Sequence, residues 1–135
     1  MFEGIELNEV AILVAAASNM VIGSVWYASF AKPWAKLIGK TEKQLRDDGM
    51  AGVGYLVAIV TALLSSSVVA IVSYWAGVVD GIEGLVVGGV LWALVSSMLA
   101  VNYAFSQRPL KLFLLDAGNL LLTLLAAGAI IGAWQ

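Results

Sequence analysis

The sequence contains no cysteine and no histidine, and only 12% of its 135 residues are charged. Without cysteine there is no disulfide bond, thiolate nucleophile or cysteine-ligated metal. Without histidine the chain lacks the commonest metal ligand and the usual general base. A soluble domain carries about twice this charged fraction, whereas 61% of these residues are hydrophobic. The composition therefore predicts an integral membrane protein with a single transmembrane domain over residues 1–135.

Several chemical functions are excluded by what the sequence lacks. It has no nucleophile–base pair and no paired carboxylates of the kind that catalysis requires. It has no phosphate-binding loop and no nucleic-acid-binding motif. We therefore predict that the protein is not an enzyme, uses no metal or other cofactor, and does not bind nucleic acid.

Four apolar stretches are long enough to cross a bilayer. A membrane-spanning helix needs ~20 apolar residues, and at these lengths only a helix satisfies its own backbone hydrogen bonds. We therefore expect an all-α fold, a polytopic integral membrane four-helix bundle. Its expected spans cover about residues 7–30, 52–75, 85–105 and 110–134.

The positive charges are sorted along the chain. All seven Lys and Arg residues lie in two short segments, 32–46 and 108–111. Short loops rich in Lys and Arg stay in the cytoplasm, so the 31–51 loop is expected inside and both termini outside. The same bias opposes an antiparallel dimer. Any symmetric homo-oligomer is therefore expected to be parallel.

The 31–51 loop is expected to form short helices in the membrane interface. Pro33 suits the first turn of one helix. Thr41 and Gln44 resemble a capping box that opens a second, which Gly49 closes. The basic surface of this loop either docks on anionic lipid or a partner, or serves only to set the topology.

Small residues recur every four positions in the apolar stretches, which allows helix backbones to pack closely. Two GxxxG pairs stand out near the expected outer ends of the third and fourth spans. These pairs either join helices within the chain or join two copies of it. The residues that we assign to helix packing are Gly23, Gly84, Gly88, Gly128 and Gly132.

Asp116 is the one ionisable acid or base well inside an apolar stretch. It lies six residues past the start of the fourth span, which is ~9 Å at ~1.5 Å per residue. A carboxylate at that depth is expected to face the bundle interior or a cavity, or to carry a proton. Matching depths across the spans predicts a cytoplasm-facing polar pocket formed by Trp26, Tyr27, Asn102, Tyr103, Asp116 and Asn119, with Asn19 near its floor.

This polar cluster has two interpretations. In the first, Asp116 binds a proton, a cation or the cationic part of a solute, since membrane carboxylates commonly mark such pathways. In the second, Asp116 is only capped by neighbouring hydroxyl and amide groups or reaches the interface. Asn19 and Asn102 equally suit hydrogen bonds between helices. Trp92, near mid-depth, needs a partner for its indole N–H.

One segment has a specific pattern. Residues 19–45 read NMVIGSVWYASFAKPWAKLIGKTEKQL. The features that carry a resemblance are Gly23, the Trp26–Tyr27 pair, Phe30 with Lys32, Trp34, and the Gly39, Thr41 and Glu42 turn. In these features the chain resembles the domain-of-unknown-function 1761 family of small four-span prokaryotic membrane proteins. The resemblance implies a multi-pass protein of the prokaryotic cytoplasmic membrane, and it implies no particular activity.

Two functional hypotheses follow from the residues. The first is a parallel homo-oligomer that binds or translocates a small solute or ion through the pocket around Asp116. The second is a non-transporting interaction or lipid-binding protein that uses the basic 32–46 loop, with membrane lipids as its partners.

Overall fold

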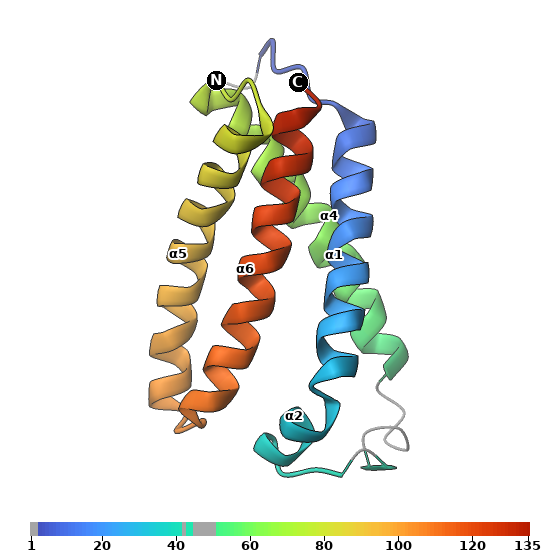
Figure 1. The fold of residues 1–135 in the computed structure, drawn as a ribbon, viewed down its shortest axis with the longest axis vertical. Coiled ribbons are helices and arrows are strands. Elements are labelled where there is room, and N and C mark those ends of the chain that lie inside the picture. The colour runs from blue at the N-terminus through green and yellow to red at the C-terminus, as the bar shows by residue number, and fades with distance from the viewer. Residues whose placement is uncertain (1–2, 42, 45–50) are drawn as a thin grey trace.

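The structure, a computed structural model, describes residues 3–41, 43–44 and 51–135. Within these ranges the chain is all-α, and its helices are α1 (Glu9–Ser29), α2 (Ala31–Leu37), α4 (Ala51–Ala76), α5 (Gly81–Phe105) and α6 (Leu110–Ala133). The four long helices form an up-and-down bundle. Both termini lie at one end of this bundle and α2 lies at the other (Figure 1).

The four predicted spans are confirmed as helices long and apolar enough to cross a membrane. The third begins earlier than the predicted residue 85, because its first turn is capped by acidic side chains. Asp80 accepts a hydrogen bond from the backbone N–H of Glu83 at 2.9 Å, and the Glu83 carboxylate accepts one from Val79 at 2.9 Å. This pattern resembles a capping box, in which side chains satisfy N–H groups that lack a partner within the helix.

Helices α5 and α6 make the closest contact in the bundle. A Cβ on Gly84 would overlap the carbonyl oxygen of Gly128, and one on Gly128 would overlap that of Gly84. A Cβ on Gly88 would overlap the backbone of Leu124, and one on Gly132 would overlap that of Asp80. The two GxxxG pairs therefore face each other within the chain, so neither is left free to join two copies.

Gly23 differs from the other glycines that the sequence assigns to helix packing. A Cβ placed on it would meet no atom within 4 Å among the described residues. No described helix backbone approaches this face of α1, so packing among the described residues does not require glycine at this position.

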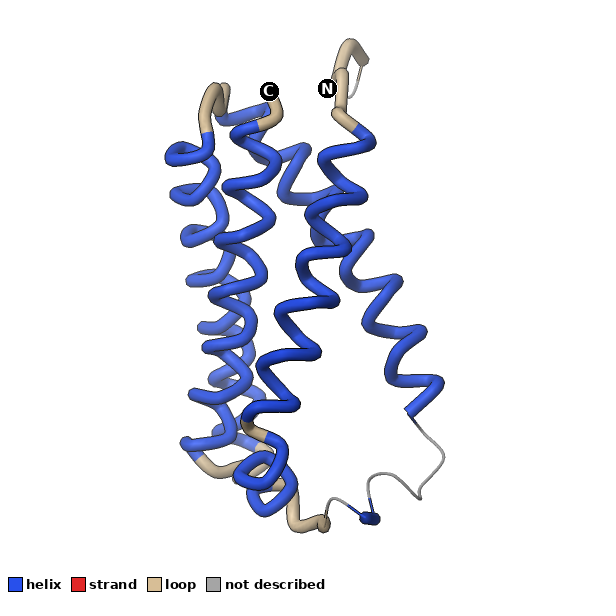
Figure 2. Tube along the Cα trace, turned by 45° about the vertical axis from the view of Figure 1, so that its right-hand side comes forward, coloured by secondary structure: helices blue, strands red, loops and turns tan. Residues whose placement is uncertain are grey.

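The apolar core lies towards the end of the bundle that carries the termini. Its buried residues come from α1, α4 and α6 and include Ala15, Val69, Ala127 and Ile131. In α4 the buried positions begin at Ala62, whereas almost all of residues 52–61 are exposed. This first part of α4 lies apart from α1 (Figure 2), and its apolar side chains are suited to contact with lipid.

The described part of the loop after α1 contains the short helix and the capping box that the sequence predicts. In α2, Ala35 is buried and the Trp34 ring lies 5.7 Å from that of Tyr27. Thr41 and Gln44 form the predicted capping box, with reciprocal backbone-to-side-chain hydrogen bonds of 2.9 and 3.1 Å. The predicted end of this second helix at Gly49, and the basic side chain of Arg46, lie outside the described residues.

Candidate functional site

The Asp116 carboxylate joins three helices. It projects from α6, and its Oδ1 accepts a hydrogen bond of 2.7 Å from the Tyr27 hydroxyl of α1. Its Oδ2 accepts a hydrogen bond from the Tyr103 hydroxyl of α5. Each carboxylate oxygen thus has a neutral donor from a different neighbouring helix. The prediction that these three side chains share a site rested on matched depth alone, and the structure brings them together.

Two tryptophans bind the backbone of α6 on either side of this carboxylate. The Trp26 indole N–H donates to the carbonyl oxygen of Leu115 at 3.0 Å. The Trp92 indole N–H donates to that of Ala117 at 2.8 Å. A helical carbonyl has a second lone pair and can accept such a bond besides its own helical one. Three consecutive residues of α6 therefore receive hydrogen bonds from aromatic side chains of α1 and α5.

Gly118 allows Trp26 to reach α6. A Cβ on Gly118 would lie 2.9 Å from Cζ2 and 3.1 Å from Cη2 of the Trp26 ring, which is too close for a well-packed contact. This residue was not among those predicted from the sequence. The available signal was a glycine two residues after the only carboxylate of a leucine-rich helix.

Further aromatic and basic groups surround the site. The Tyr103 ring packs edge-on against Phe113 with centroids 5.8 Å apart. The Arg108 guanidinium lies 5.1 Å from the Tyr103 ring centroid, within the range of a cation–π interaction. On the other side, Trp34 of α2 packs against Tyr27. The carboxylate therefore lies near the basic end of the bundle, the end that carries α2 and the α5–α6 turn.

The three asparagines predicted for this pocket have different surroundings. Asn102 is exposed and lines a shallow groove with Met98 and Arg108, so its amide does not contact the carboxylate. Asn119 lies one helical turn beyond Asp116, and its buried Oδ1 has no hydrogen-bond partner among the described residues. It is placed near the site without being bonded to it.

Asn19 faces α4 instead of the carboxylate. Its Nδ2 lies 3.5 Å from the Ser65 hydroxyl oxygen, and its Oδ1 is buried with no partner among residues that the structure describes. It is eight residues before Tyr27 on α1, a separation of about 12 Å along a helix. Asn19 therefore belongs to the α1–α4 contact, about two helical turns along α1 from Tyr27.

The arrangement is suited to the exchange of a proton or a small cation. Within the described ranges, no group of three or more acidic side chains could hold a metal ion. An ionised carboxylate only accepts hydrogen bonds, whereas a protonated one becomes a donor at one oxygen. A change in the charge or occupancy of Asp116 therefore alters its bonds to Tyr27 and Tyr103, and with them the connection between α1 and α5.

Comparison with known proteins gives one match. A family model described as a protein of unknown function (DUF1761) matches residues 10–132. This range includes Asp116, the four aromatic side chains bonded around it, and all but the ends of the four long helices. No curated protein and no solved structure matches the sequence.

Proposed function

Because the chain belongs to the DUF1761 family, whose function is unknown, we propose a function from the Asp116 site itself. The protein is a multi-pass membrane protein that binds a proton or a small cation at Asp116 and couples this binding to the movement of a small solute or ion. We assign it no catalytic role. The observation that carries the proposal is a carboxylate within a membrane helix, bonded by tyrosine hydroxyls from two other helices.

Stability alone is a weak reason to keep this carboxylate. Placing an aspartate at the centre of a membrane helix costs about 2.5–3.5 kcal/mol. Hydrogen bonds between membrane helices contribute about 0.6 kcal/mol on average, so two contribute about 1.2 kcal/mol. Asp116 lies nearer the end of its helix, where the cost is smaller, yet apolar side chains in place of the carboxylate and both tyrosine hydroxyls would carry no such cost. This balance supports a role in binding.

The two tyrosines supply the coupling. A proton turns one carboxylate oxygen into a donor, and a bound cation shares the carboxylate oxygens with the tyrosine hydroxyls. Either event weakens the bonds to Tyr27 and Tyr103 or reverses one of them. Since these bonds connect α1 and α5 through α6, binding at Asp116 changes the contact between helices, as transport of a solute requires.

The variant Asp116→Asn tests this proposal. The indoles of Trp26 and Trp92 lie on either side of the carboxylate, so their fluorescence reports its charge. We expect the purified protein to show a fluorescence transition on titration with acid, and a shift of that transition with NaCl or KCl. In Asp116→Asn the transition should be absent, while the thermal unfolding midpoint stays close to that of the wild type.

Asp80→Asn is the matched control, because it makes the same chemical change at the opposite end of the bundle, where asparagine also caps a helix well. It should keep the transition. The same transition in Asp116→Asn and in the wild type would remove Asp116 from the proposed function.

We propose further that the end carrying α2 faces the cytoplasm of a prokaryotic cell. The Lys and Arg residues that the structure describes lie at this end and both termini lie at the other (Figure 1), which agrees with the positive-inside rule. A single orientation also makes any symmetric homo-oligomer parallel. Because both GxxxG pairs are used within the chain, its contacts would come from other surfaces.

The natural absence of cysteine makes this orientation easy to test. Val79, 71% exposed in the α4–α5 connection, and Ser106, exposed after α5, are each replaced by cysteine. In intact cells a membrane-impermeant maleimide should label Val79→Cys and not Ser106→Cys, and both should be labelled after cell lysis. The reverse pattern in intact cells would contradict the proposed orientation.

A further inference from the structure

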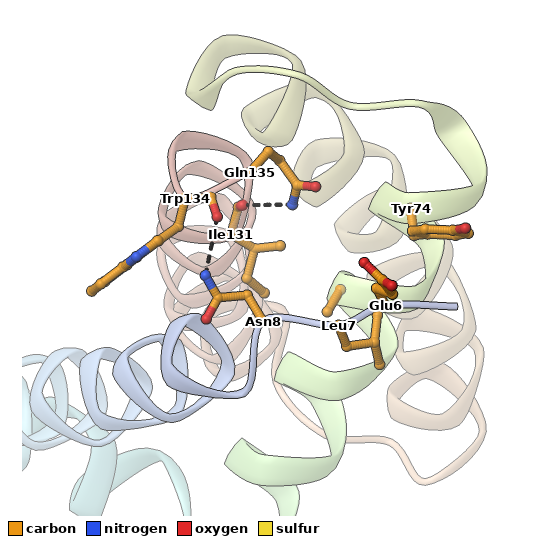
Figure 3. Close-up of a pocket in the computed structure, with 8 residues that line it drawn as sticks. Glu6, Leu7, Asn8, Tyr74, Ile131, Trp134 and Gln135 are labelled. Carbon is orange, nitrogen blue, oxygen red and sulfur yellow. Dashed lines mark hydrogen bonds between the residues drawn. The ribbon is translucent and has the colours of Figure 1, made fainter. Parts of the chain in front are cut away.

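A second pocket lies at the opposite end of the bundle from Asp116. It has a volume of about 300 Å³ and lies between the segment that leads into α1 and the last turns of α4 and α6 (Figure 3). The lining residues that matter here are Glu6, Leu7, Tyr74, Ile131, Trp134 and Gln135. Neither hypothesis drawn from the sequence used this part of the molecule.

Hydrogen bonds hold the walls of this pocket in place. The Tyr74 hydroxyl donates to the carbonyl oxygen of Gly4 at 3.0 Å, which ties the segment before α1 to the end of α4. Asn8 Nδ2 donates to the carbonyl oxygen of Trp134 at 3.1 Å, while Asn8 Oδ1 accepts from the N–H of Ala11 at 3.0 Å. The segment before α1 is thereby fastened to both α4 and α6.

Two side-chain acceptors of this pocket are left without a donor among the described residues. The Glu6 carboxylate makes no hydrogen bond or ion pair within the described part of the chain. The Gln135 side chain uses its Nε2 to donate to Ile131 at 2.8 Å, which leaves its oxygen available. Glu6, Tyr74 and Gln135 all line this pocket (Figure 3).

The electrostatic surroundings favour a positive ligand. All Lys and Arg residues of the sequence lie in the segments 32–46 and 108–111, and those described lie at the other end of the molecule. Helices α4 and α6 both end at this pocket. The C-terminal end of a helix carries a partial negative charge that attracts cations. The Glu6 carboxylate, the Gln135 amide oxygen and the Tyr74 ring all line the pocket. These three kinds of group are together suited to an organic cation.

From these groups we propose that the pocket binds an alkylammonium group, carried either by a free solute or by a lipid headgroup. The volume lies at the small end of the range for ligand pockets, which suits a headgroup-sized cation. This site is independent of Asp116, and its failure would leave the proposed function of Asp116 untouched.

Choline is the probe for this site, and 3,3-dimethyl-1-butanol, which has the same shape without the charge, is its neutral control. Binding is measured by calorimetry on the full chain in phosphatidylglycerol nanodiscs. We expect choline to bind at least about 5-fold more tightly than the alcohol, since a cation–π contact and a carboxylate each favour the cation by about 0.5–1 kcal/mol.

Three variants locate the binding. Glu6→Gln should weaken choline binding by about 3-fold or more and leave the alcohol unaffected. Glu3→Gln removes the same charge from an exposed residue outside the pocket, so it should bind choline as the wild type does. Asp116→Asn should also bind it normally. Equal affinity for choline and the alcohol, no binding of choline, or unchanged binding by Glu6→Gln would each overturn the proposal.

The lipid identifies the source of the ammonium group. In phosphatidylcholine nanodiscs a headgroup site is already occupied, so free choline should bind more weakly than in phosphatidylglycerol. Equal binding in the two lipids assigns the pocket to a free solute.

Discussion

Replacement of Gly128 by alanine is expected to lower the free energy of unfolding of the bundle by about 3 kcal/mol. The added Cβ would overlap the carbonyl oxygen of Gly84, and the Gly88 backbone lies close behind it. Backbone atoms in the middle of a helix cannot rotate away as a side chain can. Helices α5 and α6 would therefore have to separate, with loss of the packing that drives helix association in a membrane.

The same substitution at Gly23 is the matched control and should have the opposite sign. A Cβ there meets nothing within 4 Å among the described residues. Alanine should therefore stabilise the protein by up to about 1 kcal/mol, because glycine is the poorer helix former. Reversible unfolding in mixed micelles, followed by tryptophan fluorescence, measures both variants. Equal stability of the two would show that the α5–α6 glycine contact does not hold the bundle together.

Replacement of Asp116 by leucine is expected to cost about 2–4 kcal/mol. The variant leaves the hydroxyls of Tyr27 and Tyr103 without their acceptor, and each unsatisfied buried group costs about 1–3 kcal/mol. The triple variant Asp116→Leu, Tyr27→Phe, Tyr103→Phe removes all three polar partners together. It should recover most of the lost stability, because replacing every partner of a buried hydrogen bond by apolar groups is nearly neutral.

Unfolding in mixed micelles measures this pair of variants as well. A triple variant as stable as the wild type, but without the acid-dependent fluorescence transition, would separate the binding role of Asp116 from any structural one. A triple variant less stable than Asp116→Leu would show that the carboxylate and tyrosines serve mainly to hold the helices together.

Much of the candidate site could be predicted from the sequence because depth in a membrane helix follows from residue number. Counting from the span ends places Tyr27, Tyr103 and Asp116 all within about 9 Å of the inner ends of their spans, and the structure joins them. Depth does not give the direction of a side chain around its helix. Asn102 and Tyr103 are adjacent, and so about 100° apart on α5; Tyr103 faces α6, whereas Asn102 is exposed.

The sequence by itself determined that this protein is suited to a membrane, where its four spans lie and how its charges are separated. Each of these depends on the order of residues along the chain. Only the tertiary structure decided that the GxxxG pairs of α5 and α6 pack against each other. It also placed Gly118 against the Trp26 ring and formed an open pocket lined by residues from 6 to 135. These features depend on which helix faces meet across long stretches of chain, and hydropathy and spacing do not encode that choice.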